Sequence, residues 1–191
     1  MKIWQRAARR IAVAAVIGGV GWAMALLGMV PGVTLAGATR EPVPCDRLPG
    51  RAVPSLGADH LSYLGEPHEP YNSRPPTSGP HMPWIISGGV FRRPVADEYQ
   101  VHLLEHGKVL VQYPVGAPAA TARRLEGFAR RYPDKTVVAP SAHVPAGVAL
   151  TAWQRIDLLP GYDERRIVHF IDALAGRYDH GWAKGAGDCA P

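Results

Sequence analysis

The chain has 191 residues, enough for one domain with a substantial core, and 47% of them are hydrophobic. Its net charge of +5 would suit a nucleic-acid partner, but four of the 21 basic residues lie within the first 38 positions, leaving 17 against 16 acidic residues. The remainder is nearly neutral, which argues against a basic phosphate-binding face, and we expect no nucleic-acid partner.

The N-terminus combines a short basic region with an uncharged stretch from Ile11 to Val30, which is long enough to span a bilayer. We therefore expect residues 1–38 to be a signal anchor, with the N-terminus cytoplasmic and the C-terminal domain extracytoplasmic by the positive-inside rule. A cleaved signal is the alternative, because residues 36–38 read Ala-Gly-Ala and cleavage after Ala38 would release a secreted or periplasmic protein. The anchor is preferred because the apolar core of a signal peptide is usually only about 7 to 15 residues long.

Residues 39–57 are rich in Pro and Gly without a clear period, which predicts a linker before an extracytoplasmic domain over residues 58–191. Six prolines between Glu66 and Pro83 then exclude a regular helix or strand and indicate an irregular loop. The anchors expected for this loop are Tyr71, Met82 and Trp84.

The next segments are short and apolar. Residues 60–64 fit a short strand or turn, and a short strand is possible around residues 90–91. Residues 101–104 fit either a strand or one turn of helix, whereas residues 108–113 predict a strand.

Two amphipathic helices are expected in the second half of the chain, over residues 118–131 and 163–174, the latter with Asp163 as N-cap. The apolar face of the first consists of Ala122, Leu125, Phe128 and Ala129. The apolar face of the second consists of Ile167, Phe170, Ile171 and Leu174.

Residues 136–139 and 148–156 predict two further strands, so the order of elements is β-β-α-β-β-α. This order predicts a single α+β domain, a mixed β-sheet with two helices packed on one face. The chain contains no GxGxxG, Walker or CxxC motif, so we expect no nucleotide cofactor and no thioredoxin-type redox chemistry.

Cys45 and Cys189 are the only cysteines. In an oxidising compartment they predict one disulfide between the two ends of the exported part. Two unpaired thiols, or pairing between chains, are the alternatives.

The candidate site consists of His81, His102 and His106, which lie within 26 residues among turn-forming residues. If residues 101–106 are helical, the spacing of four places His102 and His106 on one face beside Glu105, as a metal site requires. If they form a strand, whether His102 and His106 lie close together depends on the shape of the following turn. In the alternative without a metal, one of these two histidines is hydrogen-bonded within the fold and the other lies on the surface.

Met82 beside His81 adds a thioether, and soft sulfur with nitrogen ligands favours copper over zinc, although Met82 fits an apolar plug equally well. His60 and His143 are reserve ligands. The histidines read as structural are His68, His169 and His180. Ser78 with a histidine base and Glu105 as orienter is the hydrolase alternative, but its surroundings lack a nucleophile-elbow motif.

The blocks PPTSGPH at residues 75–81 and HLLEHG at residues 102–107 resemble the DUF3105 family of uncharacterised bacterial proteins. The upstream His60 and the block Thr-Ala-Trp at residues 151–153 are also similar. The resemblance implies an envelope protein with one N-terminal membrane segment. It also implies a shared site formed by His81, His102, Glu105 and His106, without assigning an activity. One departure is Gln154, where the family pattern usually continues with Gly.

The leading hypothesis is a membrane-tethered extracytoplasmic protein of unknown activity that binds a transition metal, copper before zinc, through a histidine cluster. The ligand candidates are His81, His102, His106, Met82, Glu105 and His60. An envelope interaction module with a protein partner and no metal is the second hypothesis, and a hydrolase is the third.

Overall fold

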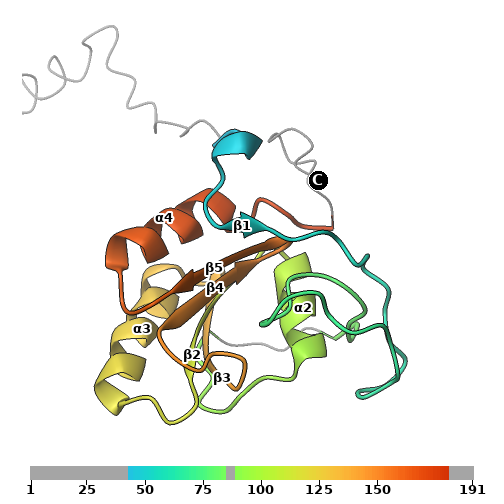
Figure 1. Ribbon diagram of the computed structural model, residues 1–191, viewed down its shortest axis with the longest axis horizontal. Coiled ribbons are helices and arrows are strands. Elements are labelled where there is room, and N and C mark those ends of the chain that lie inside the picture. Colours follow the sequence, from blue (N-terminus) through green and yellow to red (C-terminus); the bar gives the residue numbers. More distant parts are fainter. Residues whose placement is uncertain (1–42, 85–88, 181–191) are drawn as a thin grey trace, which may run out of the picture. The chain divides into compact units, whose positions relative to one another are not determined.

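A five-stranded mixed sheet in the order β1-β5-β4-β2-β3 forms the centre of the computed structural model, which describes residues 43–84 and 89–180 (Figure 1). The elements are η1 (Cys45–Arg47), β1 (Arg51–Ala52), α2 (Asp97–Glu105), β2 (Val109–Pro114), α3 (Ala119–Arg131), β3 (Thr136–Ser141), β4 (Val148–Ala152), β5 (Arg155–Leu159) and α4 (Glu164–Leu174). The predicted membrane segment and Cys189 lie outside the described residues. Within residues 43–84 and 89–180, no helix is both long and apolar enough to cross a membrane.

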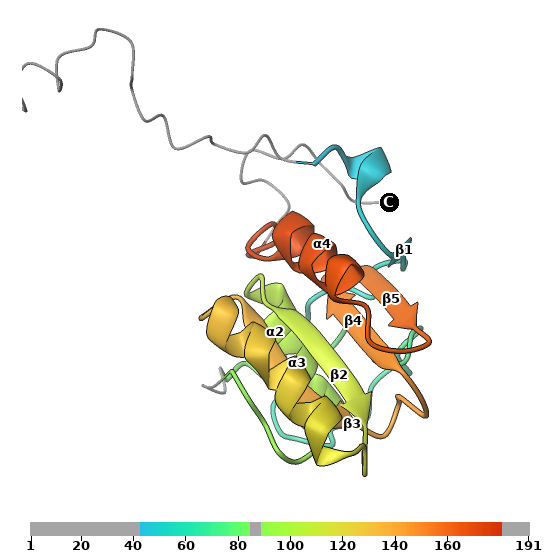
Figure 2. The ribbon, with the colours of Figure 1, turned by 90° about the vertical axis from the view of Figure 1, so that its left-hand side faces the viewer.

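Helices cover both faces of the sheet (Figures 1 and 2). α3 and α4 lie against one face, while α2 and the Pro-rich segment before it lie against the other. The predicted α+β class with a mixed sheet is therefore confirmed. The domain has three helices rather than the two expected, because α2 covers the face opposite α3 and α4.

β2 and the edge strand β3 are buried along nearly their whole length. β2 and β3 pair in parallel, with Val111 opposite Val138, and α3 connects them. Nearly every residue of both strands is buried because each face of the sheet is covered. The outer edge of β3 is covered by the short bridge between Val90 and Val138.

Both predicted amphipathic helices form as expected. In α3, Leu125, Phe128 and Ala129 are buried. In α4, Asp163 caps the N-terminus by accepting a hydrogen bond from the Arg166 backbone N–H at 3.1 Å. The predicted apolar face of α4 is buried in full.

One prediction about the strands is wrong, and one open alternative is decided. Residues 148–156 form two antiparallel strands, β4 and β5, joined by a tight turn at Trp153 and Gln154 rather than one strand. Gln154 has a φ of 56°, and this left-handed conformation helps the chain to reverse direction. Gly or Asn at such a position would have indicated a turn in the sequence, but Gln does not. Residues 101–104 belong to α2, so of the two alternatives for that segment the helix is confirmed and the strand is wrong.

Part of the range assigned to the linker packs on the sheet. β1 pairs with β5, with Arg51 opposite Ile156, and Val53 is only 1% exposed. The chain therefore enters the fold before residue 58.

Candidate functional site

α2 places two of the predicted site residues, His102 and Glu105, one turn apart on the same face. The second half of this short helix is buried, and the amide of Gln112 in β2 donates to the amide oxygen of Gln100 at 2.9 Å. This buried amide pair fixes α2 on the sheet, so the side chains that α2 carries are held in position.

The Pro-rich loop delivers His81 to the same place. The Tyr71 hydroxyl donates to the Pro80 carbonyl at 2.6 Å, and Gly79, with a φ of 123°, lies against the Tyr71 ring. A Cβ at Gly79 would lie 3.1 Å from that ring, so this position of the motif requires glycine. Tyr71 is an anchor as predicted, and Met82 is buried, but the prediction for Trp84 is wrong because it is 63% exposed.

The β4–β5 turn holds the loop from the other side. The backbone N–H of Gln154 donates to the Thr77 carbonyl at 3.0 Å, and the Gln154 carbonyl accepts from Val53 at 2.9 Å. Ser78 is fully buried, and its hydroxyl oxygen accepts a hydrogen bond from the Leu56 N–H. Ser78 thus organises the loop, which speaks against a role as nucleophile.

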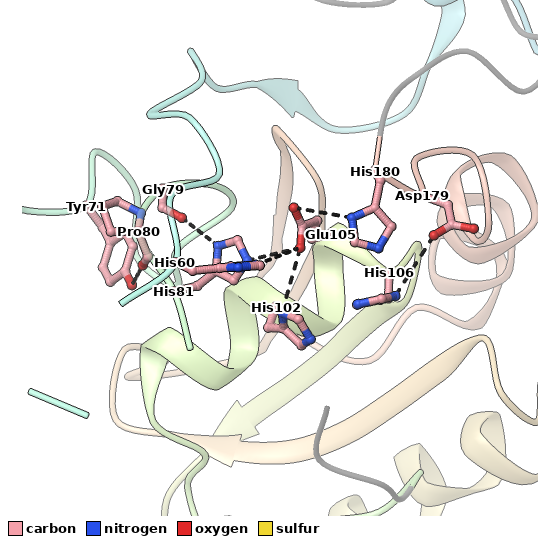
Figure 3. Close-up of polar contacts among 10 residues, drawn as sticks. All are labelled: His60, Tyr71, Gly79, Pro80, His81, His102, Glu105, His106, Asp179 and His180. Carbon is pink, nitrogen blue, oxygen red and sulfur yellow. Dashed lines mark hydrogen bonds and ion pairs between the residues drawn. The ribbon is translucent and has the colours of Figure 1, made fainter. Parts of the chain in front are cut away.

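The Glu105 carboxylate lies at the centre of the cluster (Figure 3). Its Oε2 atom is 3.0 Å from His81 Nε2, 3.7 Å from His102 Nδ1 and 3.9 Å from His60 Nε2. The ligand atoms of these four residues all lie within 4.8 Å of one another. A parallel β-bridge between His60 and His81 places His60 beside the cluster, and of the four residues only His60 is exposed.

The hydrogen bonds of His81 determine which of its nitrogens faces the carboxylate. Nδ1 lies 2.9 Å from the Gly79 carbonyl, which only accepts, so Nδ1 carries the hydrogen. In the neutral ring Nε2 then presents a lone pair to Glu105 Oε2, which is an acceptor as well. A cation, either a proton or a metal ion, is needed between these two atoms.

His102 is 3% exposed, and neither of its ring nitrogens makes a hydrogen bond with any part of the chain that the structure describes. Burial, assisted by the neighbouring His106 and His81 and opposed by Glu105, lowers the pKa of His102 to about 4. The ring is therefore neutral near pH 7, which is the form that binds metals.

His106 follows the last residue of α2 and belongs to a second group, with Glu105 and His180. Its ring centroid is 4.6 Å from that of His102, so the three predicted histidines are neighbours, but His60 rather than His106 completes the first group. The prediction that His180 is a structural residue is wrong, because His180 belongs to this second group. It follows α4 in a Gly-rich tail that carries no local signal of a site.

The two remaining ligand candidates are His143 and Met82. His143 pairs with Asp97 at 2.8 Å, at the opposite end of α2 from Glu105. Met82 is buried with its backbone N–H bonded to the Glu98 carbonyl, and a sulfur ligand from it stays a prediction. The disulfide between Cys45 and Cys189 also stays a prediction, since Cys189 is not among the described residues.

The model of a family described as "Protein of unknown function (DUF3105)" matches residues 68–186. The chain belongs to this family. No curated protein and no solved structure matches it. The DUF3105 match covers the loop, α2, the whole sheet except β1, and the segment that carries His180.

The fold brings together three blocks that lie far apart in the sequence, PPTSGPH, HLLEHG and Thr-Ala-Trp. His81 comes from the first block, and His102 and Glu105 come from the second. The ring of Trp153, from the third block, lies edge-on to His81 at 6.4 Å and stacks on Tyr178 at 4.6 Å. The three blocks therefore meet at one histidine and glutamate cluster that could hold a metal ion.

Proposed function

We propose that this DUF3105 domain binds a divalent transition-metal ion through His81, His102, Glu105 and His60. The observation that carries the proposal is the Glu105 Oε2 atom, which faces nitrogens of all three histidines within 3.9 Å. A carboxylate oxygen with three imidazole nitrogens around it offers several ligand atoms to one cation, and a metal ion placed among them would bind them together.

His102 favours a metal ion over a proton as that cation. A proton shared by His81 and Glu105 would satisfy that pair alone. It would leave both buried nitrogens of His102 without a partner, which costs about 1–3 kcal/mol for such a group. A metal ion bound by His102 as well removes part of that cost.

The spacing of the ligand atoms is compatible with tetrahedral coordination. Metal–nitrogen bonds of about 2.0 to 2.1 Å place tetrahedral ligand atoms about 3.3 Å apart. The distances from Glu105 Oε2 to the three histidines, 3.0 to 3.9 Å, bracket this value. The ligand atoms of all four residues lie within 4.8 Å of one another, so the pairs farthest apart would move closer by at most about 1.5 Å around an ion. Three imidazoles and a carboxylate suit Zn(II) or Cu(II), whereas the sequence-based preference for copper depends on a sulfur ligand from Met82.

The domain would act in the cell envelope, tethered by residues 1–38 with its N-terminus in the cytoplasm. The basic flank and the uncharged run from Ile11 to Val30 support this location. Cleavage after Ala38 would yield the same domain free in the periplasm or medium. In either case, the proposed role is to hold or sense a metal ion outside the cytoplasm.

The test is elemental analysis of the full-length chain purified without added metal, followed by calorimetric titration of the stripped chain with Zn(II) and Cu(II). We expect bound metal in the wild type and a loss of at least about tenfold in affinity for His102→Ala or His81→Ala, because each removes one ligand. His169→Ala is the matched control, since this exposed histidine lies on α4, on the other face of the sheet. A chain that takes up neither ion, or binds equally in all variants, contradicts the proposal.

An envelope interaction module is the second candidate function. It is favoured by three large apolar side chains that the irregular segment before α2 exposes: Tyr63 at 58%, Leu64 at 50% and Trp84 at 63%. Exposed aromatic groups of this kind are common in protein interfaces. If the metal titrations fail, capture of an envelope protein that is lost in Trp84→Ala would support this function.

A further inference from the structure

We propose that Glu105 bridges two metal ions, and that the second ion is held by His106 and His180. This inference depends on the proposed function, because it extends the same site. The first ion lies on the Oε2 side of the carboxylate, and the second on the Oε1 side.

The two oxygens of Glu105 face different groups of histidines. Oε2 faces His60, His81 and His102, while Oε1 lies 3.6 Å from Nδ1 of His180 (Figure 3). Ligand atoms of Glu105, His106 and His180 also lie within 4.8 Å of one another, which makes a second compact set. One carboxylate shared by two such sets is the arrangement that holds paired ions about 3.5–4 Å apart in two-metal sites.

The backbone positions His180 through the glycine of the second motif block. Gly107 has a φ of 72°, and a Cβ there would collide with the Tyr178 carbonyl oxygen and would lie 3.0 Å from Gly176. The Gly107 carbonyl accepts from Gly176 at 2.7 Å, and the His180 N–H donates to the Glu105 carbonyl at 3.2 Å. The chain after α4 is thus held directly against the end of α2, which brings His180 to the carboxylate.

The aromatic stack strengthens this placement. Tyr178 lies parallel to the buried Trp153, with 13° between the ring planes. Trp153 also borders His81, so the same side chain borders the first group and supports the segment that carries His180. Both groups are therefore held by motif residues.

Charge and exposure fit a second ion at the rim of the site. Asp179 Oδ1 lies 4.0 Å from His106 Nδ1, so a second carboxylate borders this group and helps to offset the added positive charge. The side chains of His106 and His180 are 25% and 54% exposed, whereas Glu105 is 6% exposed. The second ion would therefore exchange with solvent more readily than the first.

The test is metal stoichiometry, measured on the full-length chain by Zn(II) titration and elemental analysis after gel filtration. We expect two ions per chain in the wild type, one in His180→Ala and in His106→Ala, and weak or no binding in Glu105→Gln. His169→Ala should keep both ions. A wild type with one ion that is lost in His102→Ala but kept in His180→Ala overturns the bridge and leaves the proposed function intact. A wild type with no ion overturns both.

A spectroscopic measurement checks that the two ions share Glu105. In the chain loaded with two Cu(II) ions, the spins should couple, so the integrated signal of isolated Cu(II) should be clearly lower than the copper content. In His180→Ala the signal should match the copper content. Gly107→Ala should behave like His180→Ala, because the added Cβ displaces the segment at Tyr178. Two uncoupled signals of full intensity in the wild type contradict the bridge.

Discussion

α3 and α4 cover one face of the sheet with apolar side chains, whereas α2 and the Pro-rich segment bring buried polar groups to the other. Phe170 and Leu125 on the first face are 0% exposed and belong to the hydrophobic core. On the second face His81, His102 and Glu105 are buried as well, at 0%, 3% and 5%. The same sheet thus supports a face that stabilises the fold and a face that carries ionisable groups.

The two faces contribute differently to the stability of the fold. Burial of an apolar ring is favourable by itself, whereas a buried imidazole without a partner is unfavourable. The polar face persists because the apolar face and the loop hydrogen bonds hold it in place, as is typical of functional sites. Substitutions on the two faces should therefore have different effects on folding and on ion binding.

Phe170→Ala should produce the largest effect and should act on stability alone. Removal of this fully buried ring is expected to lower the free energy of unfolding by about 3–5 kcal/mol. The measurement is urea unfolding of the metal-free chain, with Phe170→Leu as the milder control. The number of Zn(II) ions bound per folded chain should not change, and a lower number would show that the two faces are coupled.

His102→Leu should act on the opposite face and in the opposite direction. The metal-free variant is expected to be more stable than the wild type by about 1 kcal/mol, because an apolar side chain replaces two buried nitrogens without partners. With Zn(II) at about 100 times the dissociation constant of the wild type, the wild type should gain about 2.7 kcal/mol from this site, and the variant, with binding at least about tenfold weaker, no more than about 1.4 kcal/mol. Unfolding curves with and without Zn(II) check both statements. A variant that Zn(II) stabilises as much as the wild type would contradict the role of His102 as a ligand.

Gln154→Gly should give the smallest effect. Glycine relieves the left-handed backbone at a φ of 56°, but it adds freedom to the unfolded chain and removes a buried side chain. The net change in the free energy of unfolding is expected to stay within about 1 kcal/mol, with Zn(II) affinity unchanged. In Gln154→Val the branched side chain should strain the turn, loosen the hydrogen bond to Thr77 and lower Zn(II) affinity. Equal behaviour of the two variants would show that the turn does not position the loop.

The apolar face could be predicted from the sequence in detail. α3 and α4 have a strong helical period over several turns, and a local pattern of that length indicates both the element and its buried side. The polar face could be predicted only in part. α2 is short, buried throughout its second half and weakly amphipathic, so residues 101–104 fit a strand as well as a helix. The turn at Gln154 could not be predicted, because the residue that adopts the left-handed conformation there is not glycine.

The site, too, could be predicted from the sequence only in part. His81, His102, Glu105 and His106 were expected from their motifs; the first three lie in one group, and His106 lies in the second group, which shares Glu105. His180 was not expected, because its role depends on contacts between the chain after α4 and the end of α2.

The sequence by itself determined the α+β class, both amphipathic helices and the candidates His81, His102 and His106 beside Glu105, because periodicity and motif spacing are local properties of the chain. Only the tertiary structure decided how those histidines divide into two groups on the two oxygens of Glu105. The physical reason is distance along the chain. The loop before α2, the β4–β5 turn and the tail after α4 meet only after the sheet has formed, and short backbone hydrogen bonds then fix their places.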